Sequence, residues 1–421
     1  MPLDISSIRR QFPILAERIN GHPLVYLDSA ATAQKPQCVL DAISHFYTND
    51  NGNAYRGMHP LAERATEVLE NTRRRVAHFI GAEHDEEIIF VRNATEGINL
   101  VAKSWGRQFL QKGDRVVLTI LEHHSNIVPW LQLKEERGIE IDWIDIDDKG
   151  ELQLDQLDST LHTGKVKLVA ITAQSNVLGI RPPLTKIIER AHAAGALVLV
   201  DAAQAIAHGP TNVHTLACDF LVFSGHKLYG PTGIGILYGK RSLLEQMPPF
   251  LGGGQMIREV HQGRFTPADI PMKFEAGTMP LAEAAGLHAA IDWISQYPWE
   301  EIHAHENDLL SLASEELSGV KGLQILGAFA NQRLKTKNQK LPVSGCISFA
   351  IDSVHPHDLT DILGQQGICL RAGHHCAQPL HERLGIAAST RLSVGIYTTE
   401  EEIRALRPAI EEAMKILNPK Y

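Results

Sequence analysis

Short apolar runs alternate with longer amphipathic stretches over the first half of the chain. The runs have the usual length of a β-strand, whereas the stretches between them carry apolar residues at helical spacing. This alternation predicts an α/β domain with a largely parallel sheet, because parallel strands are joined by helical crossovers. The predicted strands are 87–91, 115–120, 139–144, 167–172, 196–200 and 220–223, and the clearest predicted helices are 95–109 and 183–194.

Polar and chemically reactive residues follow most of these runs directly. In an open α/β sheet, ligands bind at the carboxyl ends of the strands. We therefore expect these residues to converge on one edge of the sheet. They are Asn93-Ala94-Thr95, Glu122-His123-His124, Ser175-Asn176, Asp201 and Ser224-Gly225-His226-Lys227.

The pattern changes after residue 247. Residues 247–280 are rich in glycine and proline and predict irregular loops with one hairpin. A helix is predicted at 302–317, and strands at 323–326 and 347–351. The polar basic segment 331–340 is expected to be a solvated loop, with a basic targeting signal as the unsupported alternative. A chain of 421 residues is too long for one ordinary core, so two domains are expected.

Composition excludes several classes of protein. The chain is 44% hydrophobic and 21% charged, which is ordinary for a soluble globular protein. Its formal net charge of -9 gives no electrostatic reason to bind nucleic acid or anionic membrane. No secretory signal is visible and no apolar run is long enough to span a bilayer. The 5 cysteines are scattered and odd in number, which favours a reducing cytoplasm over a disulfide framework.

Lys227 is the first candidate for chemistry. It follows an apolar strand, has Ser224 and His226 beside it, and precedes a glycine-rich turn at 229–233. Partial burial lowers the pKa of a lysine, so such an amine can form a Schiff base with an aldehyde cofactor. The alternative is a lysine at a strand boundary with its ammonium in water.

Asp201 and Thr95 are candidates for holding such a cofactor. Asp201 ends an apolar strand, where a carboxylate can pair with a protonated pyridine nitrogen. The alternative is a cap for the following helix. Thr95 is expected to be the N-cap of a helix whose backbone N–H groups would bind a phosphate. The alternative there is a plain capped helix.

His123, Cys376 and Arg391 complete the set. His123 could stack on a pyridine ring and shuttle protons near neutral pH, whereas a zinc site is disfavoured because suitable ligands are missing at the usual spacing. Cys376 follows Arg371 and two histidines, whose positive charge would favour the thiolate, although a Cys/His metal site is the competing interpretation. Arg391 is either a surface residue or a bidentate clamp for an α-carboxylate.

Together these segments resemble the fold-type I pyridoxal-phosphate enzymes, and within them the group II, SufS-type cysteine desulfurases of the NifS-like branch. The most specific pieces are residues 224–233 and 371–376. The resemblance implies a large mainly parallel-sheet domain at 21–299, a smaller α+β domain at 300–421 that carries the cysteine loop, and an N-terminal segment, 1–20, associated with the small domain. It also implies a homodimer.

The resemblance implies a role for each candidate. Lys227 holds pyridoxal 5′-phosphate covalently, and Asp201, Gln204 and His123 contact its ring. Thr95, Ser224 and His226 hold the phosphate, and Thr278 reaches the phosphate of the other subunit. Asn176 and Arg391 position the substrate carboxylate, and Cys376 receives the sulfur.

Three departures from the family pattern concern nearby positions. Ala94 stands where a hydroxyl is frequent, Met279-Pro280 replaces a common Pro-Asn run, and Tyr55 precedes Arg56 where a histidine is frequent. None of them removes a residue that the chemistry requires.

The implied activity is that of a sulfurtransferase: L-cysteine becomes L-alanine and leaves a persulfide on Cys376. An acceptor protein would then take the sulfur for iron–sulfur cluster assembly by the SUF system. His355 and His357 resemble the version found with a zinc-bearing, SufU-type acceptor, with a SufE-type acceptor or plain surface histidines as alternatives. A selenocysteine lyase and a non-catalytic sulfur carrier or scaffold remain the other functional hypotheses.

Overall fold

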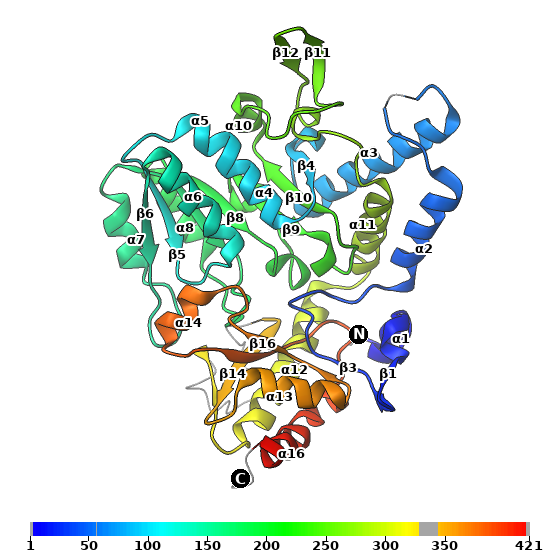
Figure 1. The fold of residues 1–421 in the computed structure, drawn as a ribbon, viewed down its shortest axis with the longest axis vertical. Coiled ribbons are helices and arrows are strands. Elements are labelled where there is room, and N and C mark those ends of the chain that lie inside the picture. Colours follow the sequence, from blue (N-terminus) through cyan, green and yellow to red (C-terminus); the bar gives the residue numbers. More distant parts are fainter. Residues whose placement is uncertain (1–2, 56, 328–343, 418–421) are drawn as a thin grey trace.

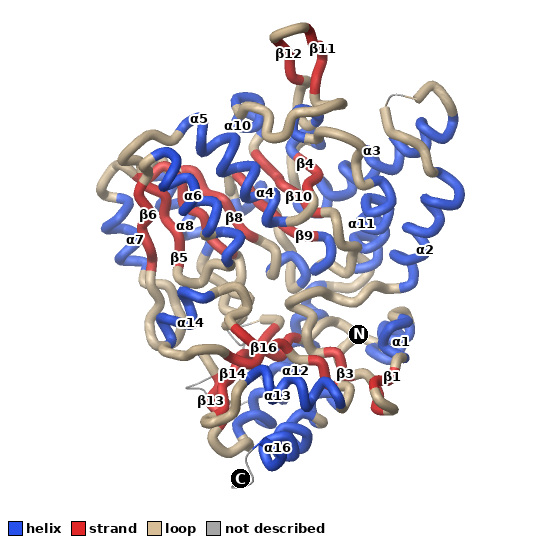
Figure 2. The backbone as a smooth tube through the Cα atoms, viewed as in Figure 1, coloured by secondary structure: helices blue, strands red, loops and turns tan. Residues whose placement is uncertain are grey.

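The computed structural model of the protein describes residues 3–55, 57–327 and 344–417. The predicted basic loop at 331–340 therefore lies outside the described residues. Figures 1 and 2 show a larger part built around one twisted sheet and a smaller part that contains the C-terminal helices. No helix in the described ranges is long and apolar enough to cross a membrane.

The described strands of the larger part form a 7-stranded sheet in the order β4-β10-β9-β8-β7-β5-β6. β5 pairs in parallel with β6 and β7, and β8 pairs in parallel with β7 and β9, as the alternation of strands and helices predicts. β10 is antiparallel to both of its neighbours and was not predicted. The strands are β4 (Ile88–Val91), β5 (Arg115–Thr119), β6 (Glu140–Ile144), β7 (Val166–Thr172), β8 (Leu197–Asp201), β9 (Phe220–Ser224) and β10 (Gly235–Gly239).

Helices cover both faces of this sheet, so its central strands are apolar on both sides. Along β8, Val198 and Val200 pack into one core with helices α3, α8 and α11, while Leu199 packs into the opposite core with α4 and α6. The helices of this part are α2 (Gln37–His45), α3 (Pro60–Ile80), α4 (Ala94–Val101), α5 (Arg107–Phe109), α6 (Val128–Arg137), α7 (Leu154–Leu161), α8 (Leu184–Ala193), α9 (Val213–Leu216), α10 (Arg241–Gln246) and α11 (Leu281–Ile294).

The smaller part has its own core around an antiparallel sheet in the order β13-β14-β17-β16. These strands are β13 (Leu323–Ile325), β14 (Cys346–Ile351), β16 (Arg371–Gly373) and β17 (Ser389–Ser393). The helices of this part are α12 (Trp299–Ser318), α13 (Pro356–Gln365), α14 (Gln378–Leu384), α15 (Glu400–Arg404) and α16 (Leu406–Leu417). The fold is therefore the predicted mainly parallel sheet with a C-terminal α+β part.

Short elements connect the N-terminal segment to the smaller part. β3 (Val25–Tyr26) pairs in parallel with β15 (Ile368–Cys369), and β1 (Arg18–Ile19) pairs with β2 (His22–Pro23). Helix α1 (Ile5–Arg10) is held by an ion pair between Arg9 and Glu402 at 2.7 Å. The domain boundaries at residues 21 and 300 stay predictions.

The predicted hairpin within 247–280 consists of β11 (Ile257–His261) and β12 (Arg264–Pro267), and it projects away from the body of the molecule (Figure 1). Val260 and Phe265 on this hairpin are 65% and 54% exposed.

A buried ion pair fixes the loop that follows this hairpin. Arg73 on α3 donates from both terminal nitrogens to the two carboxylate oxygens of Glu275, at 2.8 and 2.9 Å, and also donates to the carbonyl of Ile88 at 2.7 Å. Glu275 additionally accepts the backbone N–H of Phe90 at 2.9 Å. Helix α3, strand β4 and the segment before Thr278 therefore meet at one desolvated pair of charges.

We predict that Glu275→Ala or Arg73→Ala destabilises the fold by about 3–5 kcal/mol, because each leaves a buried charge without its bidentate partner. Arg73→Met with Glu275→Leu should cost less than either single change. Denaturant unfolding of the cofactor-free protein measures both. The control is Arg107→Met, which breaks the exposed pair with Glu136 and should have little effect. Additive costs in the double variant would contradict the prediction.

Candidate active site

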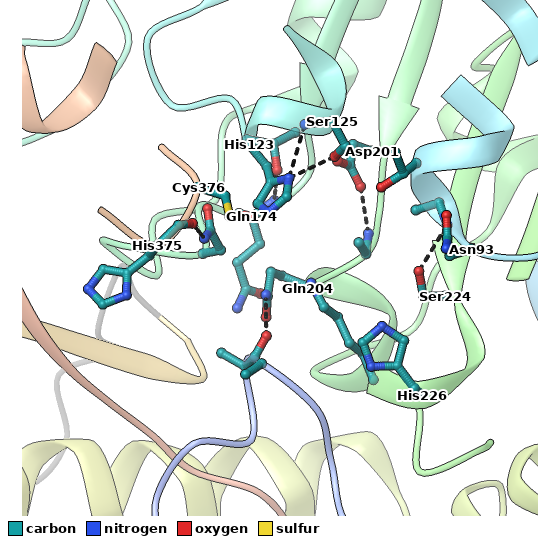
Figure 3. Close-up of a pocket in the computed structure, with 18 of the residues that line it drawn as sticks. Asn93, His123, Ser125, Gln174, Asp201, Gln204, Ser224, His226, His375 and Cys376 are labelled. Atoms are coloured by element: carbon teal, nitrogen blue, oxygen red, sulfur yellow. Dashed lines mark hydrogen bonds between the residues drawn. The ribbon is translucent and has the colours of Figure 1, made fainter. Parts of the chain in front are cut away.

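One cavity of about 230 Å³ lies between the two parts of the molecule, at the carboxyl ends of the parallel strands. Figure 3 shows side chains from both parts pointing into it. It brings together most of the candidates from the sequence, whereas Thr278 is exposed and does not line it. The lining candidates are Thr95, His123, Asn176, Asp201, Gln204, Ser224, His226, Lys227, Cys376 and Arg391.

Lys227 ends a single helical turn, Gly225–Lys227, directly after β9. Burial lowers the pKa of its amine to about 8, and the nearby Arg391 and Arg371 act in the same direction, while Asp201 opposes them. The amine is still mainly protonated at pH 7, but its unprotonated fraction, which is the form able to attack a carbonyl carbon, is far larger than that of an ordinary lysine. This environment contradicts the alternative of a solvated ammonium.

Asp201 lies at the end of β8 and is 4% exposed. Its Oδ1 accepts the backbone N–H of Ala203 at 3.0 Å, within the same turn. It does not cap a helix, because the next helical turn begins after Gln204. Burial raises the pKa of Asp201 and Lys227 partly offsets this. Gln204 donates to the carbonyl of Ala30 at 2.8 Å, which holds its amide against the cavity wall.

The start of α4 forms the other end of the cavity. Asn93, not Thr95, is the N-cap: its backbone is extended and its side chain accepts the N–H of Glu96 at 3.0 Å. The predicted cap was therefore wrong by two positions, and Thr95 instead lies in the first turn with its side chain facing the cavity. Ser224 Oγ accepts the N–H of Ala94 at 2.9 Å and so joins β9 to this turn (Figure 3).

His123 is held in one tautomer by its neighbour. Its Nδ1 accepts the backbone N–H of Ser125 at 3.1 Å and lies 2.8 Å from the Ser125 hydroxyl, so the neutral ring carries its proton on Nε2. Burial, followed by the charge of Lys227, lowers the pKa of His123 to about 3. The expected titration near neutral pH was therefore wrong for this cavity, because a buried imidazolium beside an amine is disfavoured.

Cys376 is exposed at the mouth of the cavity, on the loop between β16 and α14. Its carbonyl accepts a hydrogen bond from the backbone N–H of His124 at 2.7 Å. The carbonyl of the preceding residue, His375, accepts one from Nδ2 of Asn176 at 2.7 Å. Both residues adopt left-handed backbone conformations, with φ of 51° at His375 and 56° at Cys376. Such conformations are costly for non-glycine residues and persist only where surrounding contacts impose them.

His375 has a role in this loop that sequence reasoning missed. It is buried, and its Nε2 lies 3.0 Å from the hydroxyl of Ser389. Burial and the nearby Arg391 lower its pKa to about 2. The expectation that both histidines supply positive charge to Cys376 was thus wrong for His375, while the guanidinium of Arg371 lines the cavity. A His-His-Cys run does not reveal which ring is buried.

Arg391 lies in the middle of β17 and is 2% exposed, so the surface alternative was wrong. It donates to the carbonyl of Asn176 at 2.8 Å and to Asp28 Oδ1 at 3.2 Å. Its Nε is buried without a hydrogen-bond partner. Burial raises the pKa of Asp28, whereas Arg391 and Arg371 lower it. This guanidinium has donor capacity left for a ligand.

Gln174 is a further lining residue that was not predicted. Its amide nitrogen donates to the carbonyl of Ser344 at 3.0 Å, and its amide oxygen accepts a hydrogen bond from Nε of Arg181 at 2.9 Å. Its position after β7 was the only available signal. In the described part of the chain no group of three or more His, Cys, Asp and Glu side chains is arranged to hold a metal ion.

A buried amine, a buried carboxyl group at the end of the next strand and a helix N-terminus, all at the carboxyl edge of this sheet, define a fold-type I pyridoxal-phosphate enzyme. The structure of the cysteine desulfurase CsdA from Escherichia coli superposes with a TM-score of 0.88 at 38% identity and covers 98% of this chain and 99% of that chain. The family model for aminotransferase class-V matches residues 25–406.

Two relatives of similar sequence identify the group of pyridoxal-phosphate enzymes to which the chain belongs. A probable cysteine desulfurase from Vibrio cholerae is 44% identical and covers 99% of this chain and 100% of its own length. A cysteine desulfurase from Synechococcus elongatus is also 44% identical over 97% of this chain, which spans 63% of that relative's length. The chain therefore belongs to the cysteine desulfurases of the class-V aminotransferase family, whose cofactor is pyridoxal 5′-phosphate.

The residues of the cavity fit this cofactor. Lys227 would hold its aldehyde carbon, Asp201 its pyridine nitrogen, and the N-terminus of α4 its phosphate. The unpaired Nε of Arg391 leaves a donor for a substrate carboxylate.

We predict that Lys227→Ala abolishes covalent capture of the cofactor, seen as the loss of a borohydride-stable linkage. In the parent, the rate of capture should rise with pH up to about 8 and level off above it, because the unprotonated amine is the attacking form. Stopped-flow absorbance on the cofactor-free protein measures this rate. A reducible linkage in the variant would show that another lysine is the anchor, and a parental rate independent of pH would contradict the lowered pKa of Lys227.

Proposed function

We propose that this protein converts L-cysteine into L-alanine and leaves the sulfur as a persulfide on Cys376. The supporting observation is that Cys376 and Lys227 line one cavity, although they belong to different parts of the fold. A binding or carrier module would need a thiol, but it would have no use for a buried amine with a lowered pKa beside a buried carboxyl group.

The side chains divide the reaction between them. The cofactor, when bound, supplies an electron sink at the substrate's α-carbon. Arg391 holds the substrate carboxylate, and the Lys227 amine accepts the α-proton. The Cys376 thiolate attacks the substrate sulfur, an S–S bond forms, and the C–S bond breaks with its electron pair left on the carbon fragment. That fragment takes up protons and leaves as alanine.

We predict that Cys376→Ala lowers alanine formation from cysteine at least about 100-fold, because the sulfur has no nucleophile to receive it. The cofactor absorbance and its change on adding cysteine should persist, since Lys227 and Asp201 are untouched. The matched control is Cys369→Ala, a half-buried cysteine on β15, which should keep its activity. Alanine and sulfide released at the parental rate by Cys376→Ala would remove its role.

We also infer that the active form is a homodimer. Thr278 is exposed and lies outside the cavity of its own chain, so a second copy would give it a cofactor phosphate to contact. The projecting hairpin β11–β12 offers apolar side chains for the same interface. We place the enzyme in the cytoplasm and its sulfur in iron–sulfur cluster assembly by the SUF system, where a reducing medium keeps Cys376 out of disulfides.

A zinc-bearing acceptor of the SufU type is the partner we favour. His355 is occupied locally: it caps α13, and its Nδ1 accepts the N–H of His357 at 3.3 Å. The exposed ring of His357 stacks on His355 with 5.4 Å between centroids. His357 lies next to Gly373, three residues before Cys376. A Cβ atom added at Gly373 would be 3.8 Å from His357 Nε2. An imidazole is therefore available beside the persulfide loop to replace a zinc ligand of the acceptor.

We predict that His357→Ala keeps its activity on cysteine without acceptor but loses at least about 10-fold of its stimulation by a zinc-bearing acceptor, because one ligand exchange is removed. The matched control is His355→Asn, which removes the neighbouring imidazole and retains a capping side chain. Alanine production is measured with each acceptor type. Stimulation of His357→Ala equal to that of the parent would make a zinc-free SufE-type acceptor the better assignment.

A further inference from the structure

Lys35 is a half-buried lysine directly behind the turn that carries Lys227. Its ammonium donates to Thr32 Oγ1 and to the carbonyl of His226, each at 3.2 Å, and to the carbonyl of Ala33. These three bonds use all of its protons. Burial lowers its pKa to about 8, which leaves it mainly charged at neutral pH. Within the described ranges of the chain, no carboxylate forms an ion pair with this ammonium.

The carbonyl of His226 is the point on which these contacts converge. It accepts hydrogen bonds from the N–H of Ala33 at 3.1 Å, from Thr32 Oγ1 at 3.3 Å and from Lys35. This carbonyl belongs to the peptide bond that joins His226 to Lys227. The segment 32–35 therefore clamps the backbone between a proposed phosphate contact and the amine that captures the cofactor.

Among the described residues, the side chains proposed to contact the phosphate supply no fixed positive charge. Thr95 and Ser224 are neutral, and burial together with Lys227 and Lys35 lowers the pKa of His226 to about 4. A phosphate monoester carries about −1.5 to −2 charges at pH 7. The N-terminus of α4 contributes only about half a positive charge.

The two arginines of the cavity, Arg371 and Arg391, do not supply the missing positive charge. Both are engaged by Asp28, at 3.2 Å for Arg391 and 3.8 Å for Arg371. Arg391 is also bound to the carbonyl of Asn176, on the side of the Cys376 loop.

We propose that Lys35 is a positioning residue of the cofactor site, whose ammonium holds the peptide between His226 and Lys227 and places a positive charge behind the phosphate. Lys35 does not line the cavity, so it acts through His226 and the clamped backbone. The proposal rests on the phosphate contacts inferred above. It implies that the Lys35 ammonium strengthens the binding of a ligand that carries a phosphate group.

The test compares two ligands on the cofactor-free protein: pyridoxal 5′-phosphate and pyridoxal, which lacks the phosphate. Lys35→Gln removes the charge and keeps a hydrogen-bond donor, whereas Lys35→Arg keeps the charge. Lys240→Gln is the control for the loss of a lysine charge away from this cavity: Lys240 donates to the carbonyl of Ala217 and pairs with Asp219 at 2.7 Å, and it lines a different pocket. Dissociation constants come from absorbance titration, and circular dichroism of each cofactor-free variant verifies folding.

We expect Lys35→Gln to weaken the binding of pyridoxal 5′-phosphate by about 10- to 100-fold, the range of one charged hydrogen bond, with less than about a 3-fold change for pyridoxal. Lys35→Arg and Lys240→Gln should stay close to the parent. Equal weakening for both ligands would refute the charge role and leave a purely structural one, and unchanged binding would refute the proposal entirely. A parent that binds both ligands equally well would refute the phosphate contacts themselves.

Discussion

Two hydrogen bonds to backbone carbonyls join the large and small parts of the molecule at the cavity. The carbonyl of His375 accepts a hydrogen bond from the side-chain amide of Asn176, and the carbonyl of Cys376 accepts one from the backbone N–H of His124; both donors follow strands of the large sheet. They hold two consecutive residues in left-handed conformations that neither would adopt alone. The thiol is therefore presented to the cavity by contacts across the two cores, and any change in how the parts pack would move it.

Burial then decides which groups of the cavity carry charge. It lowers the pKa of Lys227 to about 8, of His226 to about 4 and of His123 to about 3, because a low dielectric disfavours each cation. Arg391 contributes a guanidinium cation to the same cavity. The cavity thus combines a nucleophilic amine and neutral imidazoles with a fixed cation for a carboxylate, which is the division of labour that desulfuration of an amino acid requires.

The alternation of apolar runs and helical stretches was sufficient to predict the parallel strands, and the polar residues after them do converge on one edge. The same reasoning missed β10, because periodicity does not reveal the direction of a short strand after a glycine-rich turn. It placed the cap of α4 at Thr95 instead of Asn93, since both residue types can cap a helix. It also assigned charge to His375, because burial of one ring in a His-His pair depends on distant residues such as Ser389.

The sequence by itself determined the fold class, the strand ends and the identity of the residues able to do the chemistry, because these depend on local periodicity and on side-chain type. Only the tertiary structure decided that Cys376 faces Lys227 across two cores and that Asp28 holds Arg391. It also decided that Lys35 donates to the carbonyl of the peptide that precedes Lys227. These contacts join residues far apart in the chain, and desolvation and packing, which no local pattern encodes, bring them together.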